Sequence, residues 1–134
     1  MAQDRLLDGL LTQFAGLPGG LLPLLHAIQR ELGHIPPQVV PEVALAMNVS
    51  RAEVHGVISF YLDFRSTEPG RHRLQICRAE ACQAMGAREL EQYAMSSLGI
   101  DYGDTTGDGH ITLEPVYCLG NCACSPSVRI DDEI

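Results

Sequence analysis

The sequence predicts an α/β protein in which a helical N-terminal segment is followed by a β-α-β-β unit. Up to residue 64, apolar residues recur every three or four positions, which is typical of amphipathic helices. Beyond residue 72, short segments instead alternate apolar and polar side chains, as strands do, and turn-rich stretches separate them. We therefore expect a helical segment over residues 1–64 and a second domain over residues 65–134.

Two leucine-rich stripes predict the first two helices. Apolar side chains at helical spacing cover residues 6–14 and 21–32, and the pair Gly19–Gly20 separates the two stripes. Gly33 is placed to end the second helix, because glycine readily adopts the left-handed conformation found just past a helix C-terminus.

Two further helices are expected before residue 65. A proline pair opens the segment 36–47, and proline fits the first turn of a helix, where its missing N–H is not needed. Asn48 is expected to close this third helix. Ser50 and Glu53 have the spacing of a capping box, in which each side chain binds an orphan amide, so we expect a fourth helix from there through the apolar stripe 54–61.

Three strands and one helix are expected in the second domain. Alternating segments at 74–76 and 111–113 predict strands that lead toward Cys77 and Cys118, and residues 128–130 predict a last short strand. Between the first two strands, apolar residues at helical spacing over 90–98 predict a helix. A glycine- and aspartate-rich loop then leads to the second strand.

Composition and charge exclude several classes of function. The chain has 134 residues, 46% of them hydrophobic, and a net charge of −8, so its surface repels nucleic acid and anionic membranes. It contains no lysine, which excludes Schiff-base chemistry and a P-loop lysine. No apolar stretch approaches the length of a membrane span, and the N-terminus does not resemble a signal peptide. We therefore expect a cytoplasmic protein.

All five cysteines lie in the second half of the chain, which is also the acidic half. Residues 77–134 hold ten acidic residues and three arginines, whereas residues 1–76 hold seven acidic residues and six arginines. An odd number of cysteines in a chain without an export signal argues against a disulfide framework. Metal binding or redox chemistry is the better interpretation.

Four of the cysteines form two pairs that each follow a predicted strand. Cys77 and Cys82 lie in CRAEAC, and Cys118 and Cys122 lie in CLGNC, so neighbouring strand ends could bring four thiolates together. Structural zinc sites and thioredoxin-type dithiols usually contain CxxC, which this chain lacks. The wider spacing favours a 2Fe-2S cluster, in which each of two irons takes two thiolates. Zinc and buried structural thiols remain alternatives.

CRAEAC at 77–82 together with CLGNCACSP at 118–126 resembles the CxxxxC and CLGxCxxxP signature of the thioredoxin-like 2Fe-2S ferredoxins, the family of the 24 kDa subunit of respiratory complex I. The likeness extends upstream through PGGLLPLLHAIQRELGHIP at 18–36 and SRAEVHGVISFYLDF at 50–64. Within the family, RAEACQAMGA and CACSP look most similar to the gamma subunits of NAD-dependent, molybdenum-containing formate dehydrogenases.

The resemblance implies an N-terminal helical bundle followed by a thioredoxin-like 2Fe-2S ferredoxin domain, with Cys77, Cys82, Cys118 and Cys122 as the cluster ligands. It implies an electron-transfer subunit that does not catalyse a reaction on its own. The implied partners are a flavoprotein subunit with FMN and the NAD site, and a catalytic subunit with the molybdenum cofactor. Family members continue beyond the position of Ile134, so we expect a short or differently packed C-terminus.

Several alternatives stand beside this interpretation. The same module could serve respiratory complex I or an NAD-reducing hydrogenase, and a non-redox zinc-binding interaction module or a thiol-disulfide enzyme is the rival from another class. Cys124 is expected to support its loop rather than to bind iron, and the five histidines lack metal-ligand spacing. His55 is the least easily assigned of the five. Since reduction adds negative charge to an acidic segment, we expect a low reduction potential.

Overall fold

The computed structural model describes residues 1–134, which divide into two compact units, Met1–Glu68 and Pro69–Ile134. The division lies four residues beyond the boundary expected after residue 64. Each unit has its own apolar core, as an independently packed domain requires. No helix in either unit is both long and apolar enough to cross a bilayer.

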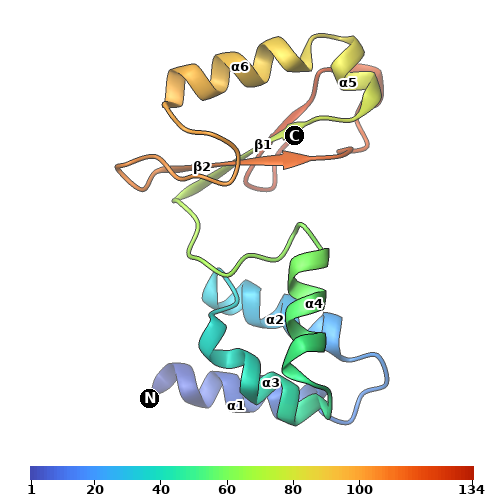
Figure 1. Ribbon diagram of the computed structural model, residues 1–134, viewed down its shortest axis with the longest axis vertical. Helices are drawn as coiled ribbons and strands as arrows, with labels where there is room; N and C mark the ends of the chain where they lie inside the picture. The colour runs from blue at the N-terminus through green and yellow to red at the C-terminus, as the bar shows by residue number, and fades with distance from the viewer. The chain divides into compact units, whose positions relative to one another are not determined.

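The first unit contains four α-helices, as the sequence predicts. They are α1 (Ala2–Phe14), α2 (Leu21–Leu32), α3 (Val40–Met47) and α4 (Arg51–Phe60), and the short 3-10 helix η1 (Pro37–Val39) precedes α3 (Figure 1). The proline pair therefore opens a 3-10 turn and not the α-helix itself. Proline has no backbone N–H to donate, and the first residues of a helical turn need none, so the proline pair can begin the turn that leads into α3.

The ends of these helices follow from local chemistry. Gly33 and Asn48 both adopt the left-handed conformation, with φ of 81° and 54°, and end α2 and α3 as predicted. The capping box of α4 is also confirmed. The Ser50 hydroxyl accepts a hydrogen bond from the Glu53 amide at 3.1 Å, and the Glu53 carboxylate accepts one from the Ser50 amide at 2.7 Å.

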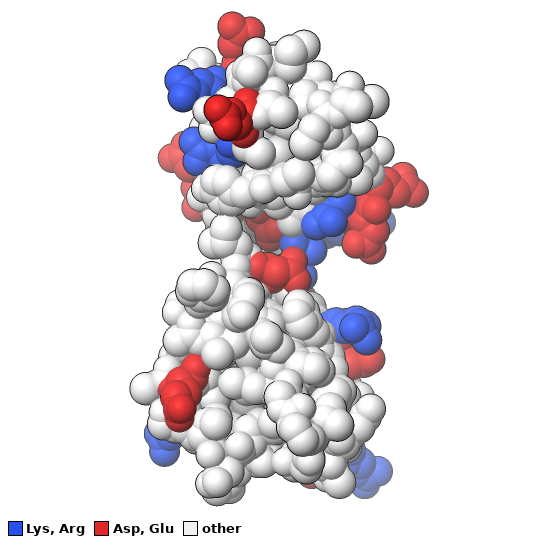
Figure 2. Space-filling model, turned by 90° about the vertical axis from the view of Figure 1, so that its right-hand side faces the viewer, with Lys and Arg blue, Asp and Glu red and all other residues white.

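Buried aliphatic side chains from all four helices form the core of this unit. Each fully buried leucine, isoleucine or valine stabilises the fold by about 1.5–3 kcal/mol relative to an exposed one. In Figure 2 most of the visible face of this unit is uncharged, and the charged side chains of the C-terminal unit lie around the margins of its visible face. The most deeply buried residues of the core are Leu24, Leu25, Ile28, Ile35, Val40, Val43 and Val54.

The second unit is built on a three-stranded sheet in the order β2-β1-β3. Strand β1 (His72–Cys77) pairs in parallel with β2 (Ile111–Val116) and antiparallel with β3 (Val128–Ile130). All three strands coincide with segments predicted from the alternating pattern. The parallel pairing places the carboxyl ends of β1 and β2 at the same edge of the sheet.

Helix α6 (Ala87–Leu98) lies along one face of this sheet (Figure 1). Its residue Ala94 packs in one cluster with Ile76 of β1 and Leu113 of β2. A short helix, α5 (Glu80–Ala84), precedes α6 and was not expected. Five residues are too few to show a helical repeat of apolar side chains, so the sequence carries no periodic signal there.

Candidate metal centre

The predicted ligand pairs lie at the carboxyl ends of the two parallel strands. Cys77 is the last residue of β1 and lies opposite Val116, the last residue of β2. Cys118 follows two residues later. Cys82 is in α5, and Cys122 is the first residue of the short 3-10 helix η2 (Cys122–Cys124).

The four thiols form two pairs of different exposure. Cys77 and Cys82 are 1% and 2% exposed and pack in one cluster with Ala87. Cys118 and Cys122 are exposed, and their sulfur atoms are 3.8 Å apart. The Ser125 hydroxyl lies 3.5 Å from the Cys82 sulfur and 2.7 Å from the Cys122 carbonyl, so the second pair lies close to the first.

The electrostatics of the pairs differ because their surroundings differ. Burial raises the pKa of the Cys77 thiol, and the neighbouring Cys82 raises it further. The pKa of Cys82 is lowered, first by its hydrogen bond with the Ser125 hydroxyl and then by the backbone amide of Ser127. A hydrogen bond with Cys118, together with charge repulsion from it, raises the pKa of Cys122.

Backbone amides point at the sulfur atoms from several directions. The amides of Ala79 and Leu119 interact with the Cys77 sulfur, and the Gly120 amide donates a hydrogen bond to the Cys118 sulfur at 3.3 Å. Amides that donate to sulfur stabilise thiolates and are one of the means by which proteins set the potential of an iron-sulfur cluster. The donor set therefore fits a cluster held by anionic sulfur.

The grouping of the side chains also bears on which metal the site could take. No three of the chain's histidine, cysteine, aspartate and glutamate residues are arranged as ligands of a single ion. The sulfur atoms occur instead as two pairs, one at and after the end of β1 and the other after β2. Two pairs of thiolates match the ligand set of a cofactor with two irons.

The backbone of the second cysteine loop adopts unusual conformations. Cys118 has a φ of 127°, a region that residues with a β-carbon rarely occupy, and Gly120 has a φ of 72°. Such conformations cluster at functional sites, where the surrounding structure holds them. In this loop they turn the chain back so that the Gly120 amide meets the Cys118 sulfur.

Sequence reasoning missed the contacts that residues 125–127 make with both cysteine loops. The Ser125 hydroxyl lies 3.5 Å from the Cys82 sulfur and donates to the Cys122 carbonyl at 2.7 Å. The Ser127 carbonyl accepts a hydrogen bond from the Cys77 amide at 3.1 Å. Ser125 lies within the motif CLGNCACSP, but the motif gives no indication that its hydroxyl contacts Cys82.

Cys124 and the histidines occupy less specialised positions. Cys124 is exposed, and its backbone amide donates a hydrogen bond to the Asn121 carbonyl at 3.0 Å, so its backbone supports the loop. His72 hydrogen-bonds Asp131 at 2.8 Å at the edge of the sheet. The His26 ring contacts the Phe64 ring in a tilted arrangement in the helical unit, with ring centroids 4.7 Å apart.

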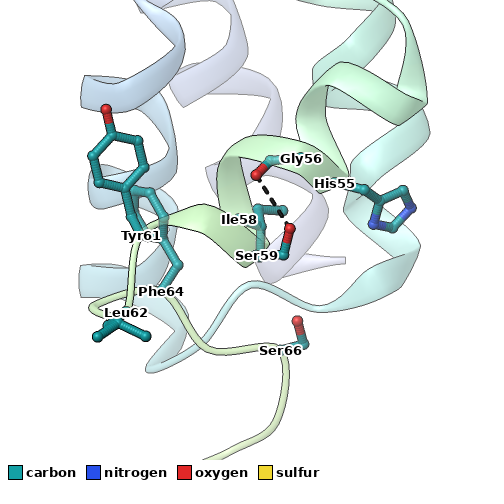
Figure 3. A pocket seen from close by; sticks show the side chains of 8 residues that line it. All are labelled: His55, Gly56, Ile58, Ser59, Tyr61, Leu62, Phe64 and Ser66. Atoms are coloured by element: carbon teal, nitrogen blue, oxygen red, sulfur yellow. Dashed lines mark hydrogen bonds between the residues drawn. The ribbon is translucent and has the colours of Figure 1, made fainter.

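A separate hollow of about 490 Å³ lies in the helical unit, at the end of α4 (Figure 3). Its lining includes His55, Ser59 and several apolar side chains. The Ser59 hydroxyl donates to the Gly56 carbonyl at 3.2 Å, and the His55 ring points away from it (Figure 3). A serine nucleophile requires a base within hydrogen-bond reach, so this hollow holds no nucleophile-base pair.

The sequence model of the thioredoxin-like [2Fe-2S] ferredoxin family matches residues 7–134. The chain belongs to this family. The 2Fe-2S cofactor predicted from the cysteine spacing is therefore confirmed, as is the thioredoxin-like fold.

Curated relatives are components of oxidoreductases. The chain is 36% identical to NADH-quinone oxidoreductase subunit 2 of Thermus thermophilus, over 88% of this chain and 65% of the relative. It is 37% identical to a component of the NADH-quinone oxidoreductase of Rhizobium meliloti, over 99% of this chain and 79% of the relative. It is 34% identical to the NADP-reducing hydrogenase subunit HndA of Solidesulfovibrio fructosivorans, over 87% of this chain and 68% of the relative. The chain thus spans only part of the length of each relative.

A solved structure supports the fold assignment. A chain of an NAD+-reducing [NiFe]-hydrogenase in the H2-reduced state superposes with a TM-score of 0.68 at 24% identity. The match covers 83% of this ferredoxin-family chain but only 18% of the hydrogenase chain. It therefore shows a shared fold and not a shared activity.

Proposed function

We propose that the chain is the electron-transfer subunit of a multi-subunit oxidoreductase and that Cys77, Cys82, Cys118 and Cys122 bind its one 2Fe-2S cluster. The observation that carries the proposal is that the two cysteine pairs follow the carboxyl ends of the paired strands β1 and β2, with Ser125 in contact with both Cys82 and Cys122. When bound, the cluster accepts and returns one electron at a time.

The residues of the chain have two tasks in this role. The thiolates of the buried pair and of the exposed pair hold the two irons, and the amides of Leu119, Gly120 and Ser127 donate to sulfur. Burial of Cys77 and Cys82 excludes water from one side of the site. The exposure of Cys118 and Cys122 leaves the other side open to a redox partner.

The parent complex is the finer part of the proposal. We propose a cytoplasmic NAD-dependent formate dehydrogenase, with FMN and the NAD site on a flavoprotein partner and the molybdenum cofactor on a catalytic subunit. The support is the likeness of RAEACQAMGA and CACSP to the gamma subunits of such enzymes. The second candidate is an NADH-quinone oxidoreductase or a hydrogenase, which the names of the relatives favour.

The ligand assignment is tested by electron paramagnetic resonance of the dithionite-reduced full chain, together with iron and acid-labile sulfide analysis. We expect two irons and two sulfides per chain and a rhombic spin-half signal. The signal should be lost in Cys82→Ala and Cys118→Ala and kept in Cys124→Ala, the matched control. Zinc without labile sulfide, or a signal that survives both ligand changes, would refute the assignment.

The parent complex is tested by isolating the tagged chain with its native partners. We expect the isolated complex to reduce NAD with formate and to contain molybdenum and FMN. Electron transfer from NADH to quinone, or NAD(P) reduction by hydrogen, in a complex without molybdenum would instead identify the second candidate.

A further inference from the structure

The Ser125 hydroxyl touches both cysteine loops. It lies 3.5 Å from the Cys82 sulfur, a normal distance for a hydrogen bond that involves sulfur, and 2.7 Å from the Cys122 carbonyl, to which it donates. Cys82 belongs to the first pair and Cys122 to the second. One hydroxyl therefore connects the two halves of the candidate site.

The direction of the bond to sulfur depends on the state of Cys82. In the free thiol, the Cys82 S–H donates to the Ser125 oxygen, which leaves the serine proton for the Cys122 carbonyl. A metal-bound Cys82 has no proton to donate. Because a hydroxyl carries one donor and two acceptor positions, contact with a thiolate requires that Ser125 turn its own proton toward sulfur.

We propose that Ser125 is a positioning residue that donates a hydrogen bond to the Cys82 sulfur of the ligated site. This hydrogen bond raises the reduction potential of the cluster. This inference rests on the proposed role of Cys82 as a ligand. Reduction increases the negative charge on the ligand sulfurs, so a donated hydrogen bond strengthens and favours the reduced state. The serine keeps its proton in both redox states.

Ser127 provides a matched comparison within the same loop. Its hydroxyl accepts a hydrogen bond from the Asn121 side chain at 3.1 Å and donates to the Asn121 carbonyl at 3.2 Å. Only its backbone amide interacts with the Cys82 sulfur, and an alanine keeps that amide. Ser127→Ala therefore removes a hydroxyl that supports the loop without removing a donor to sulfur.

The test is a redox titration of the reconstituted full chain, followed by electron paramagnetic resonance. In Ser125→Ala we expect the equilibrium constant for one-electron reduction to fall roughly tenfold, which lowers the midpoint potential by about 59 mV. Ser125→Thr retains the hydroxyl and should restore the midpoint. Ser127→Ala should leave the midpoint within error while lowering the yield of loaded protein.

The outcomes separate this inference from the proposed function. A Ser125→Ala protein with full iron and sulfide but an unchanged midpoint overturns the role of Ser125 and leaves the ligand assignment intact. A midpoint that falls equally in Ser127→Ala also overturns it, because loop packing then accounts for the shift. Loss of the ligand role of Cys82, seen as an unaltered signal in Cys82→Ala, overturns the proposed function itself.

Discussion

At the scale of single residues, the second cysteine loop depends on backbone conformation. Gly120 has a φ of 72°, and a β-carbon placed there would meet no atom within 4 Å. Glycine is therefore favoured at this position by its dihedral angle and not by lack of space. The same residue supplies the amide that donates to the Cys118 sulfur.

Replacing Gly120 with alanine should destabilise the chain by about 1–2 kcal/mol, the cost of the left-handed conformation for a residue with a β-carbon. Gly107→Ala is the matched control, because a β-carbon there also meets open space and its φ lies outside the left-handed region. Urea denaturation followed by circular dichroism measures both. Equal losses in the two variants would contradict the conformational explanation.

Single residues also mark the limit of what the sequence predicts about the site. The spacing of Cys77, Cys82, Cys118 and Cys122 identifies candidate ligands because ligand pairs are close in sequence. The contact between Ser125 and Cys82 spans 43 residues. No local pattern encodes it, since it exists only after the strands have paired.

At the scale of elements, one carboxylate links the end of β3 to the beginning of β1. Asp131 follows β3 and accepts hydrogen bonds from the His72 ring at 2.8 Å and from the Arg73 amide at 2.9 Å. These bonds, the one from His72 first, hold the pKa of Asp131 below its usual value of 3.8. The short strand β3 thus has a side-chain anchor in addition to its backbone pairing.

Ionised Asp131 should stabilise the chain above about pH 4, because its pKa is lower in the folded chain than in the unfolded one. This contribution is lost as the pH falls below 3.8, the usual pKa, and then through the lowered pKa that Asp131 has in the folded chain. Asp131→Asn should therefore be less stable than the parent chain at pH 7, with a difference that shrinks in acid.

Urea denaturation between pH 7 and about pH 2.5 measures the difference. Asn tolerates the φ of 55° at this position, so the substitution tests the charge and not the backbone. Asp132→Asn removes the same charge from the neighbouring exposed residue and is the control. A pH-independent difference between Asp131→Asn and the parent chain would contradict the prediction.

Element boundaries were predictable where a local signal exists. Gly33, Asn48 and the pair Ser50 and Glu53 fix helix ends through their own conformations and side chains. Helix α5 was missed because it is too short for a periodic pattern and its formation depends on packing of Cys82 and Ala87 against the end of the sheet.

At the scale of the whole molecule, charge is distributed unevenly between the two units. Residues 69–134 carry ten acidic residues and five arginines, a net charge of −5, and the whole chain carries −8. Adding an electron to a site within this acidic unit is opposed by charge repulsion. Salt screens such repulsion, since the Debye length falls from about 30 Å at 0.01 M to about 3 Å at 1 M.

The midpoint potential of the reconstituted chain should therefore be low and should rise as the salt concentration increases across this range. Redox titrations in potassium chloride measure the shift, with sucrose at equal osmolarity as the uncharged control. A midpoint that is clearly positive, or one that falls with added salt, would contradict the electrostatic argument.

The parallel pairing of β1 with β2 also determines when the site can form. Cys82 and Cys118 are separated by 35 residues, and the two loops meet only after β2 has docked beside β1. Parallel pairing across such a separation is a late and slow step, because loop closure must precede its contacts. We therefore expect iron and sulfide to enter after the sheet has formed, so that a variant with a weakened β1–β2 pairing should yield a smaller loaded fraction.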